Sequence, residues 1–232
     1  MGSTKKRAVC LLSGGMDSAV AAYIAKREGY EIYALTIDYG QRHARELASA
    51  RRLARSLGAR EHKVMLINLR AIGGSALTDS IKVPERKNAK DVKANHEIPL
   101  TYVPARNTIF LSIALAYAET AKADAIYIGA NHIDYSGYPD CRPEYFHAFQ
   151  KLADLATKTG VEGHRIFIRA PLLRMSKSDI VKKAIELKVP LELTWSCYQG
   201  GRKACGVCDS CVLRRQGFKE AGLADPVEYE RT

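Results

Sequence analysis

The segment from Ser13 to Ser18, Ser-Gly-Gly-Met-Asp-Ser, has the composition of a phosphate-binding loop without a lysine. The common phosphate loop, G-x-x-x-x-G-K-S/T, places a lysine near the β- and γ-phosphates. Here two glycines let the backbone approach an anion closely, and two serine hydroxyls add hydrogen-bond donors. Because a carboxylate repels phosphate, Asp17 is expected to act through a bound Mg²⁺. The alternative is a glycine turn in which Asp17 and Ser18 only cap a helix.

The elements around this segment favour the phosphate-binding interpretation. The apolar run Val9–Leu12 predicts a strand, and the alanine-rich run Ser18–Arg27 predicts a helix. A loop between them presents backbone N–H groups at a helix N-terminus, where the helix dipole favours negative charge. The residues expected to bind a nucleotide are Leu12, Ser13, Gly14, Gly15, Met16, Asp17, Ser18 and, at the end of the second predicted strand, Ile37.

The rest of the chain alternates short apolar runs with amphipathic stretches. Further strands are predicted over Val64–Ile67, Ala125–Gly129 and Ile166–Ile168, and helices over His43–Leu57, Asn107–Ala121, Ser176–Leu187 and Asp209–Ala221. Strands that alternate with helices predict the α/β class, with a doubly wound, Rossmann-like parallel sheet. Ligands of such sheets bind beyond the carboxyl ends of the strands. Residues 73–99 show no periodicity, and within them Lys82–Lys93, which has mixed charge and little aliphatic content, is expected to form a mobile loop or lid.

Four of the six cysteines form a compact group near the C-terminus: Cys197, Cys205, Cys208 and Cys211. Grouped cysteines in a chain of this size favour a metal over a disulfide framework. Four thiolates suit a structural, tetrahedral Zn²⁺, while the same spacing also occurs around 4Fe–4S clusters. We expect a domain of residues 1–190 and a zinc-binding segment of residues 191–232 that packs on the same core.

Composition narrows the class of protein. The apolar share of 47% is that of a globular chain, and the net charge of +11 indicates anionic partners such as nucleotides or RNA, or simply a solvated basic surface. The apolar run after Lys5–Arg7 is too short for a signal peptide, and no stretch is long enough to span a bilayer. A cytoplasmic protein without a membrane partner is therefore expected.

Two cations are candidates for anion binding. Lys177 begins a helix that the sequence Ser-Lys-Ser-Asp predicts to be capped, so its ammonium group would lie beside a helix N-terminus and could contact phosphate. The alternative is a surface lysine. Arg106 could bind a phosphate or a carboxylate with its planar guanidinium, or form an ion pair at a helix start.

The motifs together resemble a known family. S-G-G-x-D-S is similar to the signature of the ATP pyrophosphatase, or N-type PP-loop, superfamily, whose loop cradles the pyrophosphate released on adenylation. The segments D-Y-G-Q-R-H at 38–43, V-P-A-R-N at 103–107, D-Y-S-G-Y-P-D-C-R at 134–142 and the cysteine segment resemble the 7-cyano-7-deazaguanine synthases. The family usually has glycine where Ala105 stands. The resemblance extends from near Ala8 to about Tyr229.

This resemblance implies an adenine nucleotide alpha hydrolase-like fold and an ATP-dependent carbon–nitrogen ligase. The substrates would be 7-carboxy-7-deazaguanine and ammonia, and the product 7-cyano-7-deazaguanine (preQ0), a precursor of queuosine and archaeosine, formed through adenylate and amide intermediates. The implied cofactors are structural Zn²⁺ and Mg²⁺ with ATP, the implied assembly is a homodimer, and nucleic acid is not required. The alternative functions are a tRNA-modifying PP-loop enzyme and a non-enzymatic zinc-ribbon module, which leaves the phosphate loop unexplained.

The resemblance also assigns site residues. The candidate substrate-binding residues are Asp134, Tyr135, Ser136, Tyr138, Asp140 and Arg142, in which carboxylates would accept the N–H donors of a guanine-like edge and a tyrosine would stack on the ring. The candidate catalytic residues are Asp17, Lys177, Arg106 and Arg142. His43, near Glu46 at the start of the second helix, could assist deprotonation of ammonia, although a structural histidine is the preferred interpretation.

Overall fold

The structure is a computed structural model of the 232-residue chain, and it describes residues 5–41, 45–93, 98–133 and 138–231. One sheet is built from β1 (Arg7–Leu11), β2 (Glu31–Asp38), β3 (Glu61–Leu66), β4 (Ala125–Tyr127) and β5 (Phe167–Arg169). All neighbouring strands are parallel, in the order β3-β2-β1-β4-β5. The chain therefore winds outward from β1 in both directions, which confirms the predicted doubly wound parallel sheet.

Eight α-helices accompany the sheet in the described residues: α1 (Met16–Arg27), α2 (Arg45–Leu57), α3 (Ala89–Lys93), α4 (Arg106–Thr120), α5 (Pro143–Ala156), α6 (Lys158–Val161), α7 (Lys177–Glu186) and α8 (Asp209–Ala221). Short 3-10 turns lie at Leu69–Ala71, Pro139–Cys141 and Leu191–Leu193. None of the helices in the described part of the chain is long and apolar enough to cross a membrane.

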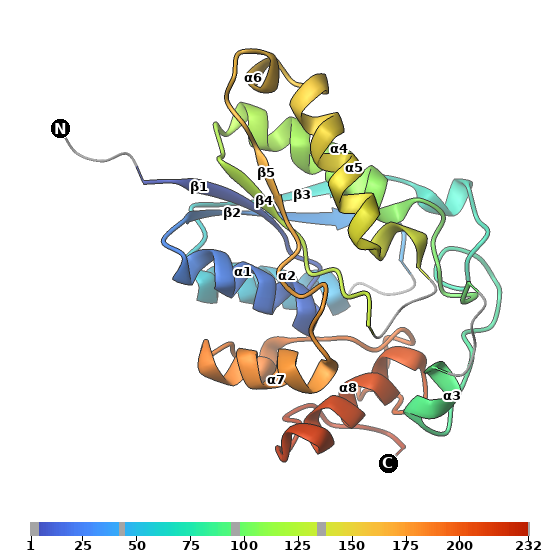
Figure 1. Ribbon diagram of the computed structural model, residues 1–232. Coiled ribbons are helices and arrows are strands. Elements are labelled where there is room, and N and C mark those ends of the chain that lie inside the picture. Colours follow the sequence, from blue (N-terminus) through green and yellow to red (C-terminus); the bar gives the residue numbers. More distant parts are fainter. Residues whose placement is uncertain (1–4, 42–44, 94–97, 134–137, 232) are drawn as a thin grey trace.

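The alternation of side chains along β1 places helices on both faces of the sheet. Val9 and Leu11 belong to the apolar core on the side of α4 and α5, whereas Ala8 and Cys10 belong to the core on the side of α1 and α2. Because both faces are buried, the strand is apolar from Ala8 to Leu11. Figure 1 shows α4 and α5 on one side of the sheet and α1 and α2 on the other.

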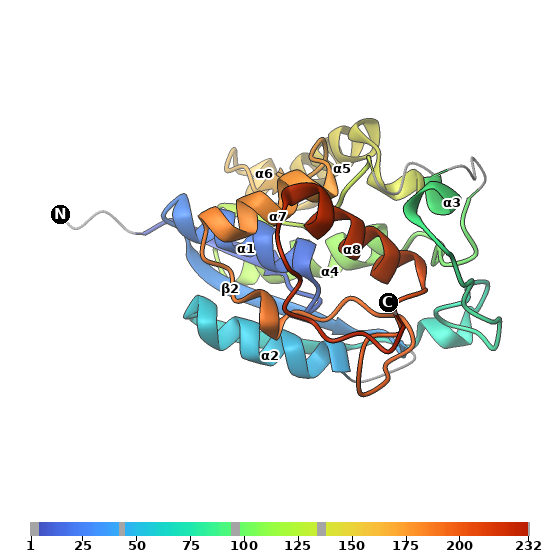
Figure 2. The same cartoon turned by 90° about the horizontal axis from the view of Figure 1, so that it is seen from below.

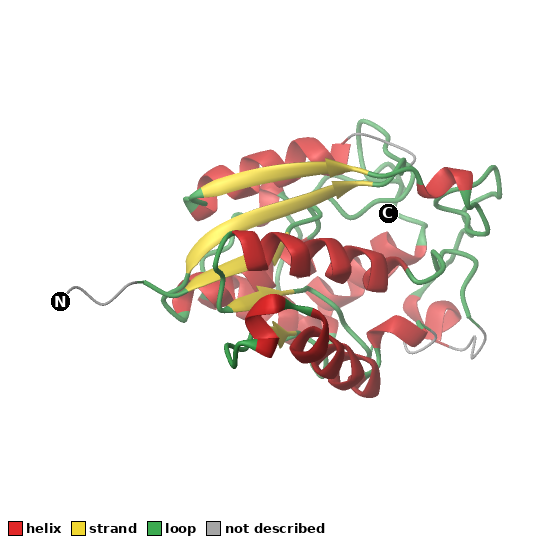
Figure 3. Ribbon diagram, turned by 90° about the horizontal axis from the view of Figure 1, so that it is seen from above, coloured by secondary structure: helices red, strands yellow, loops and turns green. Residues whose placement is uncertain are grey.

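Helices α7 and α8 add an outer layer next to α1. They pack against each other, and α7 also contacts α1 (Figure 2). The C-terminal segment thus returns to the part of the molecule that carries the phosphate loop. Figure 3 shows the strands pointing the same way, with loops gathered beyond their carboxyl ends.

Two predicted segments differ from the structure. The segment Lys82–Lys93 is packed rather than free, since Val83 is buried and the Arg86 N–H donates to the Val207 carbonyl at 2.7 Å. Strand β3 begins at Glu61 and not at Val64, because an edge strand tolerates charged residues that an apolar pattern does not reveal. Helix α5 was not predicted.

Close backbone contacts fix the start of α1. Gly14 has φ +92°, and a Cβ added to it would lie 2.2 Å from the Glu46 carbonyl oxygen at the start of α2. A Cβ on Gly129, which follows β4, would lie 2.6 Å from the backbone carbonyl carbon of Asp17 and from the backbone nitrogen of Ser18. The loop after β1 is therefore packed, backbone against backbone, by neighbours on two sides.

Alanine substitutions at two positions separate two reasons why a position requires glycine, which are a left-handed backbone and a close contact with a neighbour. Gly58 has φ +66° and no atom within 4 Å of an added Cβ, so Gly58→Ala should cost only the strain of a left-handed residue, about 1–2 kcal/mol. Gly14→Ala adds the collision with Glu46 and should cost about 2–5 kcal/mol. Urea unfolding of both variants measures the difference, and equal losses would contradict the packing argument.

Candidate functional site

A cavity of about 230 Å³ lies beyond the carboxyl ends of β1, β2 and β4. Seven of the eight residues predicted to bind nucleotide line it: Leu12, Ser13, Gly15, Met16, Asp17, Ser18 and Ile37. Gly14 is not part of the lining, because its backbone is packed against α2. The cavity lies at the point where the strand order reverses, as expected for a ligand site in an open α/β sheet.

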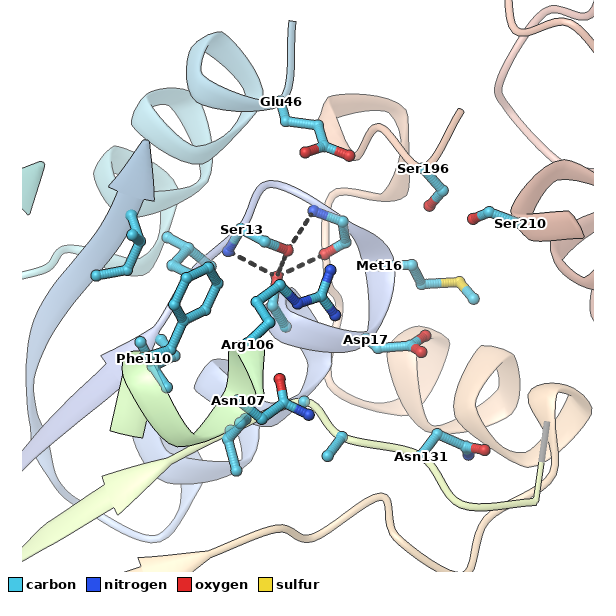
Figure 4. A pocket seen from close by; sticks show the side chains of 18 of the residues that line it. Ser13, Met16, Asp17, Glu46, Arg106, Asn107, Phe110, Asn131, Ser196 and Ser210 are labelled. Carbon is cyan, nitrogen blue, oxygen red and sulfur yellow. Dashed lines mark hydrogen bonds between the residues drawn. The ribbon is translucent and has the colours of Figure 1, made fainter. Parts of the chain in front are cut away.

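The Ser18 hydroxyl organises the phosphate loop. It donates to the Gly15 carbonyl at 2.9 Å, accepts from the Ser13 backbone N–H at 3.1 Å and lies 3.0 Å from the Ser13 hydroxyl (Figure 4). The Gly15 N–H in turn donates to the Ser13 hydroxyl at 3.3 Å. These bonds give the loop one shape before any anion arrives.

Helix α1 directs its N-terminus at this loop. Gly15 is the N-cap residue, and the first helical hydrogen bond runs from the Ala19 N–H to the Gly15 carbonyl at 3.1 Å. The N–H groups of Met16, Asp17 and Ser18 precede that bond, so the helix offers them no carbonyl. Together with the helix dipole they form an anion site.

Leu12 contributes its side chain rather than its backbone. Its N–H donates to the Leu35 carbonyl at 2.8 Å, and its carbonyl accepts from the buried Thr36 hydroxyl at 2.7 Å. Both backbone groups of Leu12 therefore have hydrogen-bond partners within the fold. Its apolar side chain and that of Ile37 still form one wall of the cavity.

Lys177 reaches the phosphate loop from the start of α7. Its Nζ donates to Asp17 Oδ2 at 2.8 Å, across a sequence separation of 160 residues. The lysine side chain is 9% exposed and that of Asp17 is 22% exposed. Both charges line the cavity, so the structure brings these two predicted catalytic residues together.

The capped start of α7 holds Lys177 in place. Ser176 and Asp179 form the predicted capping box, with the Asp179 N–H donating to the Ser176 hydroxyl at 3.1 Å and the Ser176 N–H to Asp179 Oδ2 at 3.1 Å. The buried Asn131, which follows β4, donates to the carbonyls of Leu172 and Met175 just before this helix. The loop after β4 is thereby tied to the segment that presents the lysine.

Arg106 opens α4 and extends into the cavity (Figure 4). Burial lowers its pKa, but the phenols of Tyr39 and Tyr138 and the carboxylate of Asp140 more than offset this, so the pKa is raised and the charge is retained. The residue before it, Ala105, has φ +51°, a conformation that favours glycine. This agrees with the glycine that the resembled family usually has at that position.

Glu46, on the first turn of α2, lines the cavity, although no role is predicted for it from the sequence. Burial raises the pKa of its carboxyl group, Arg106 opposes this and Cys197 adds to it, and together they bring the pKa to about 7. A glutamate at the start of a helix is common, and only the packing of α2 onto the phosphate loop reveals that this one faces the cavity.

The segment predicted to bind the base is only partly described. Tyr138 is buried, lines the cavity and lies 2.9 Å from the Thr101 hydroxyl. Asp140 is buried but accepts the Asn107 backbone N–H at 2.9 Å, and Arg142 is exposed at the N-cap of α5. Neither lines the cavity, and their role in substrate binding stays a prediction. Asp134, Tyr135 and Ser136 lie outside the described residues, as does His43.

The structure also shows where the thiol of Cys141 lies and which groups surround it. It lines the cavity next to Tyr138, and it accepts a hydrogen bond from Asn107 Nδ2 at 3.3 Å. Burial and, to a smaller extent, the Asp140 carboxylate raise its pKa to about 12, so the thiol stays protonated near neutral pH. Cys141 is therefore a packed thiol.

The four C-terminal cysteines meet in space. Cys197, Cys205, Cys208 and Cys211 are buried, and their sulfur atoms all lie within 4.8 Å of one another. Cys205 Sγ and Cys211 Sγ are 3.9 Å apart, close to the roughly 3.8 Å expected between two ligands of a tetrahedral zinc–sulfur site. Backbone N–H groups of Gln199 and Cys205 donate to Cys197 Sγ. The donor set and its spacing fit a metal such as zinc.

Trp195 connects this cysteine cluster to the phosphate loop. Its backbone N–H donates to the Gly14 carbonyl at 2.8 Å, and its indole Nε1 donates to the Cys197 carbonyl at 3.1 Å. The guanidinium of Arg45, at the start of α2, lies 3.8 Å from the centre of the indole ring. The cluster and the phosphate loop therefore share one residue as a support.

Arg214 fixes the same segment from α8. Its buried guanidinium forms a two-pronged ion pair with Asp225, at 2.8 and 2.9 Å, and donates to the Thr194 hydroxyl at 2.7 Å. Since Thr194 immediately precedes Trp195, the residue that holds the phosphate loop is anchored to the last helix.

The chain is similar to known proteins over nearly its whole length. The sequence pattern of the family described as "Queuosine biosynthesis protein QueC" matches residues 7–222. The 7-cyano-7-deazaguanine synthase of Anaeromyxobacter dehalogenans (strain 2CP-C) is 55% identical, covering 99% of this chain and 98% of that protein. The protein of the same name from Syntrophus aciditrophicus (strain SB) is 58% identical, with coverages of 98% and 99%.

Among solved structures, a 4-thiouridine synthetase in complex with RNA and bound ATP is 24% identical, with a TM-score of 0.48, covering 79% of this chain and 41% of that one. The family pattern spans most of the chain, and both synthases align with this chain over nearly their whole lengths. The chain thus belongs to the QueC family of queuosine biosynthesis proteins.

Proposed function

We propose that this chain is an ATP-dependent 7-cyano-7-deazaguanine synthase, which converts 7-carboxy-7-deazaguanine and ammonia into the nitrile through adenylate and amide intermediates. The observation that carries the proposal is the cavity that joins the Ser13–Ser18 loop, the Asp17–Lys177 pair and Arg106. Family membership and the names of the two synthases support it. They favour synthesis of a small molecule over the tRNA-modifying alternative.

The chemistry explains why a phosphate loop without its own lysine suits the reaction. A carboxylate conjugated to an electron-rich pyrrole is a poor electrophile, and adenylation turns one of its oxygens into part of a leaving group. The pyrophosphate that is released must be held and then let go. Backbone N–H groups at the start of α1 stabilise that negative charge without a covalent step.

The Asp17–Lys177 pair supplies the charged groups of this step. With ATP bound, Lys177 would donate to phosphate oxygens, and Asp17 would support the Mg²⁺ that accompanies the nucleotide. In the structure the two charges compensate each other at 2.8 Å, which lowers the cost of keeping them buried in the cavity.

Substrate contacts are proposed from the opposite wall. Tyr138, Asn107 and Arg106 line the cavity on the side of α4, where the guanidinium could pair with the carboxylate or adenylate of the substrate. Asp134, Tyr135 and Ser136 stay predictions for recognition of the base. Zinc in the cysteine cluster, a homodimer and a cytoplasmic location also stay predictions from the resemblance.

The direct test is an assay of the purified protein with ATP, Mg²⁺, ammonia and 7-carboxy-7-deazaguanine. Mass spectrometry should detect the amide first and then the nitrile, with AMP and pyrophosphate formed at both stages. Formation of neither product would refute the proposal. Tight, steeply salt-dependent binding of tRNA in the same preparation would favour the alternative.

Lys177→Ala should slow adenylation by about 10²–10³-fold, because the variant loses a charged donor to the transferring phosphates. Lys182→Ala is the matched control, since Lys182 lies on the same helix but is exposed. ATP–pyrophosphate exchange in the presence of the substrate measures the step. Equal rates for the two variants would show that Lys177 takes no part in adenylation.

Zinc analysis tests the cysteine cluster. Wild-type protein should be colourless and contain about one zinc per chain, whereas an iron–sulfur protein would be brown. Cys208→Ser should lose the metal and unfold at lower temperature, and it should also weaken ATP binding because Trp195 links the cluster to Gly14. Cys141→Ser, a buried cysteine outside the cluster, should keep its zinc.

A further inference from the structure

The proposed reaction requires a group that accepts protons from nitrogen, and this inference rests on that reaction. When ammonia attacks the acyl adenylate, a C–N bond forms, the C–O bond to AMP breaks, and AMP leaves with the electron pair. The new amide nitrogen must lose one proton. After the second adenylation, the two N–H protons of the amide leave as the C≡N bond forms and AMP departs.

Few groups in the described lining of the cavity could take such protons. The lining contains two carboxylates, Asp17 and Glu46, and no histidine among the residues that the structure describes. Burial raises the pKa of Tyr138 and that of Cys141 to about 12 each, so both stay protonated near neutral pH. The choice is therefore between the two carboxylates.

The surroundings of the Asp17 and Glu46 carboxylates differ. The Asp17 carboxylate is held by the Lys177 ammonium at 2.8 Å, which stabilises its charged form and opposes protonation. The Glu46 carboxylate has no hydrogen bond or ion pair with any other residue in the described parts of the chain. Of the two carboxylates, Glu46 is thus the one that no cation or donor of the described residues holds.

Glu46 also lies beside the phosphate loop, in the cavity where the proposed reaction would take place. Its helix starts against the phosphate loop, with the Glu46 carbonyl in contact with Gly14, and its carboxylate points into the cavity above Ser13 (Figure 4). Arg106 approaches from α4 on the other side of this space, so the adenylated carbon would lie between a cation and a free carboxylate. Burial brings the pKa of Glu46 to about 7, which suits a group that gains and releases a proton in each cycle.

We propose that Glu46 is the general base of this enzyme and accepts the protons that nitrogen loses, first as ammonia displaces AMP and again as the adenylated amide becomes the nitrile. Each proton then passes from the glutamic acid to solvent, and ATP supplies both leaving groups. The atoms and charges of both steps therefore balance without a further reactant.

Hydroxylamine separates this role from a structural one. It is a stronger nucleophile than ammonia, and its nitrogen, once bonded to the acyl carbon, is far more acidic and loses its proton to water without a positioned base. Glu46→Gln should slow amide formation from ammonia about 10²–10³-fold, while hydroxamate formation and ATP–pyrophosphate exchange stay within about threefold of wild type. Nitrile formation from the isolated amide should fall as well.

Two further variants complete the test. Glu46→Asp should restore part of the amide formation, and Glu192→Gln, which changes an exposed glutamate, should behave as wild type. A parallel loss of hydroxamate, amide and exchange in Glu46→Gln would overturn the proposal and assign Glu46 to the shape of the site. Unchanged amide formation would also overturn it. Absence of amide and nitrile in the wild type would instead refute the proposed function.

Discussion

The site depends on backbone packing around the first turn of α1. Gly14 touches the carbonyl of Glu46, and Gly129 touches the backbone of Asp17 and Ser18, so side chains are excluded on both sides. The segments in contact come from the ends of β1, β2 and β4. A phosphate loop held this rigidly presents its N–H groups in one arrangement, so little conformational entropy is lost when an anion binds.

The positive charge missing from the loop comes from another part of the chain. Lys177 lies on α7, whose start is fixed by its capping box and by the hydrogen bonds of Asn131 to the preceding turn. Its partner Asp17 lies on the loop itself. Because the lysine stands on a separate helix, it can contact phosphate from the side, while the loop provides only neutral donors and a carboxylate. This division suits a reaction that releases pyrophosphate and transfers a nucleotidyl group.

The cysteine cluster also supports the phosphate loop. Its metal would be structural, since four thiolates leave no open coordination position. The effect on the active site passes through Trp195, which bonds both to Cys197 and to Gly14, and through Arg214, which anchors the preceding residue. Closing the C-terminal segment with a metal and an ion pair thus stabilises the wall of the cavity as well as the fold.

The sequence by itself determined the local elements and the chemical inventory. Alternating apolar runs predicted the parallel sheet, the Ser-Gly-Gly-Met-Asp-Ser segment the anion site, and cysteine spacing the metal cluster, because each of these signals is contained in a short stretch. Helix α5 and the packing of residues 73–93 escaped prediction, since neither has a strong local pattern.

Only the tertiary structure decided which side chains share the cavity. In the structure Lys177 donates to Asp17, and Asp140 accepts a hydrogen bond from the start of α4. Arg142 lies at the surface. The structure also revealed Glu46, whose burial depends on the contact between α2 and the loop after β1. The physical reason is that charge, burial and distance between remote segments are properties of packing, and no short stretch of sequence contains them.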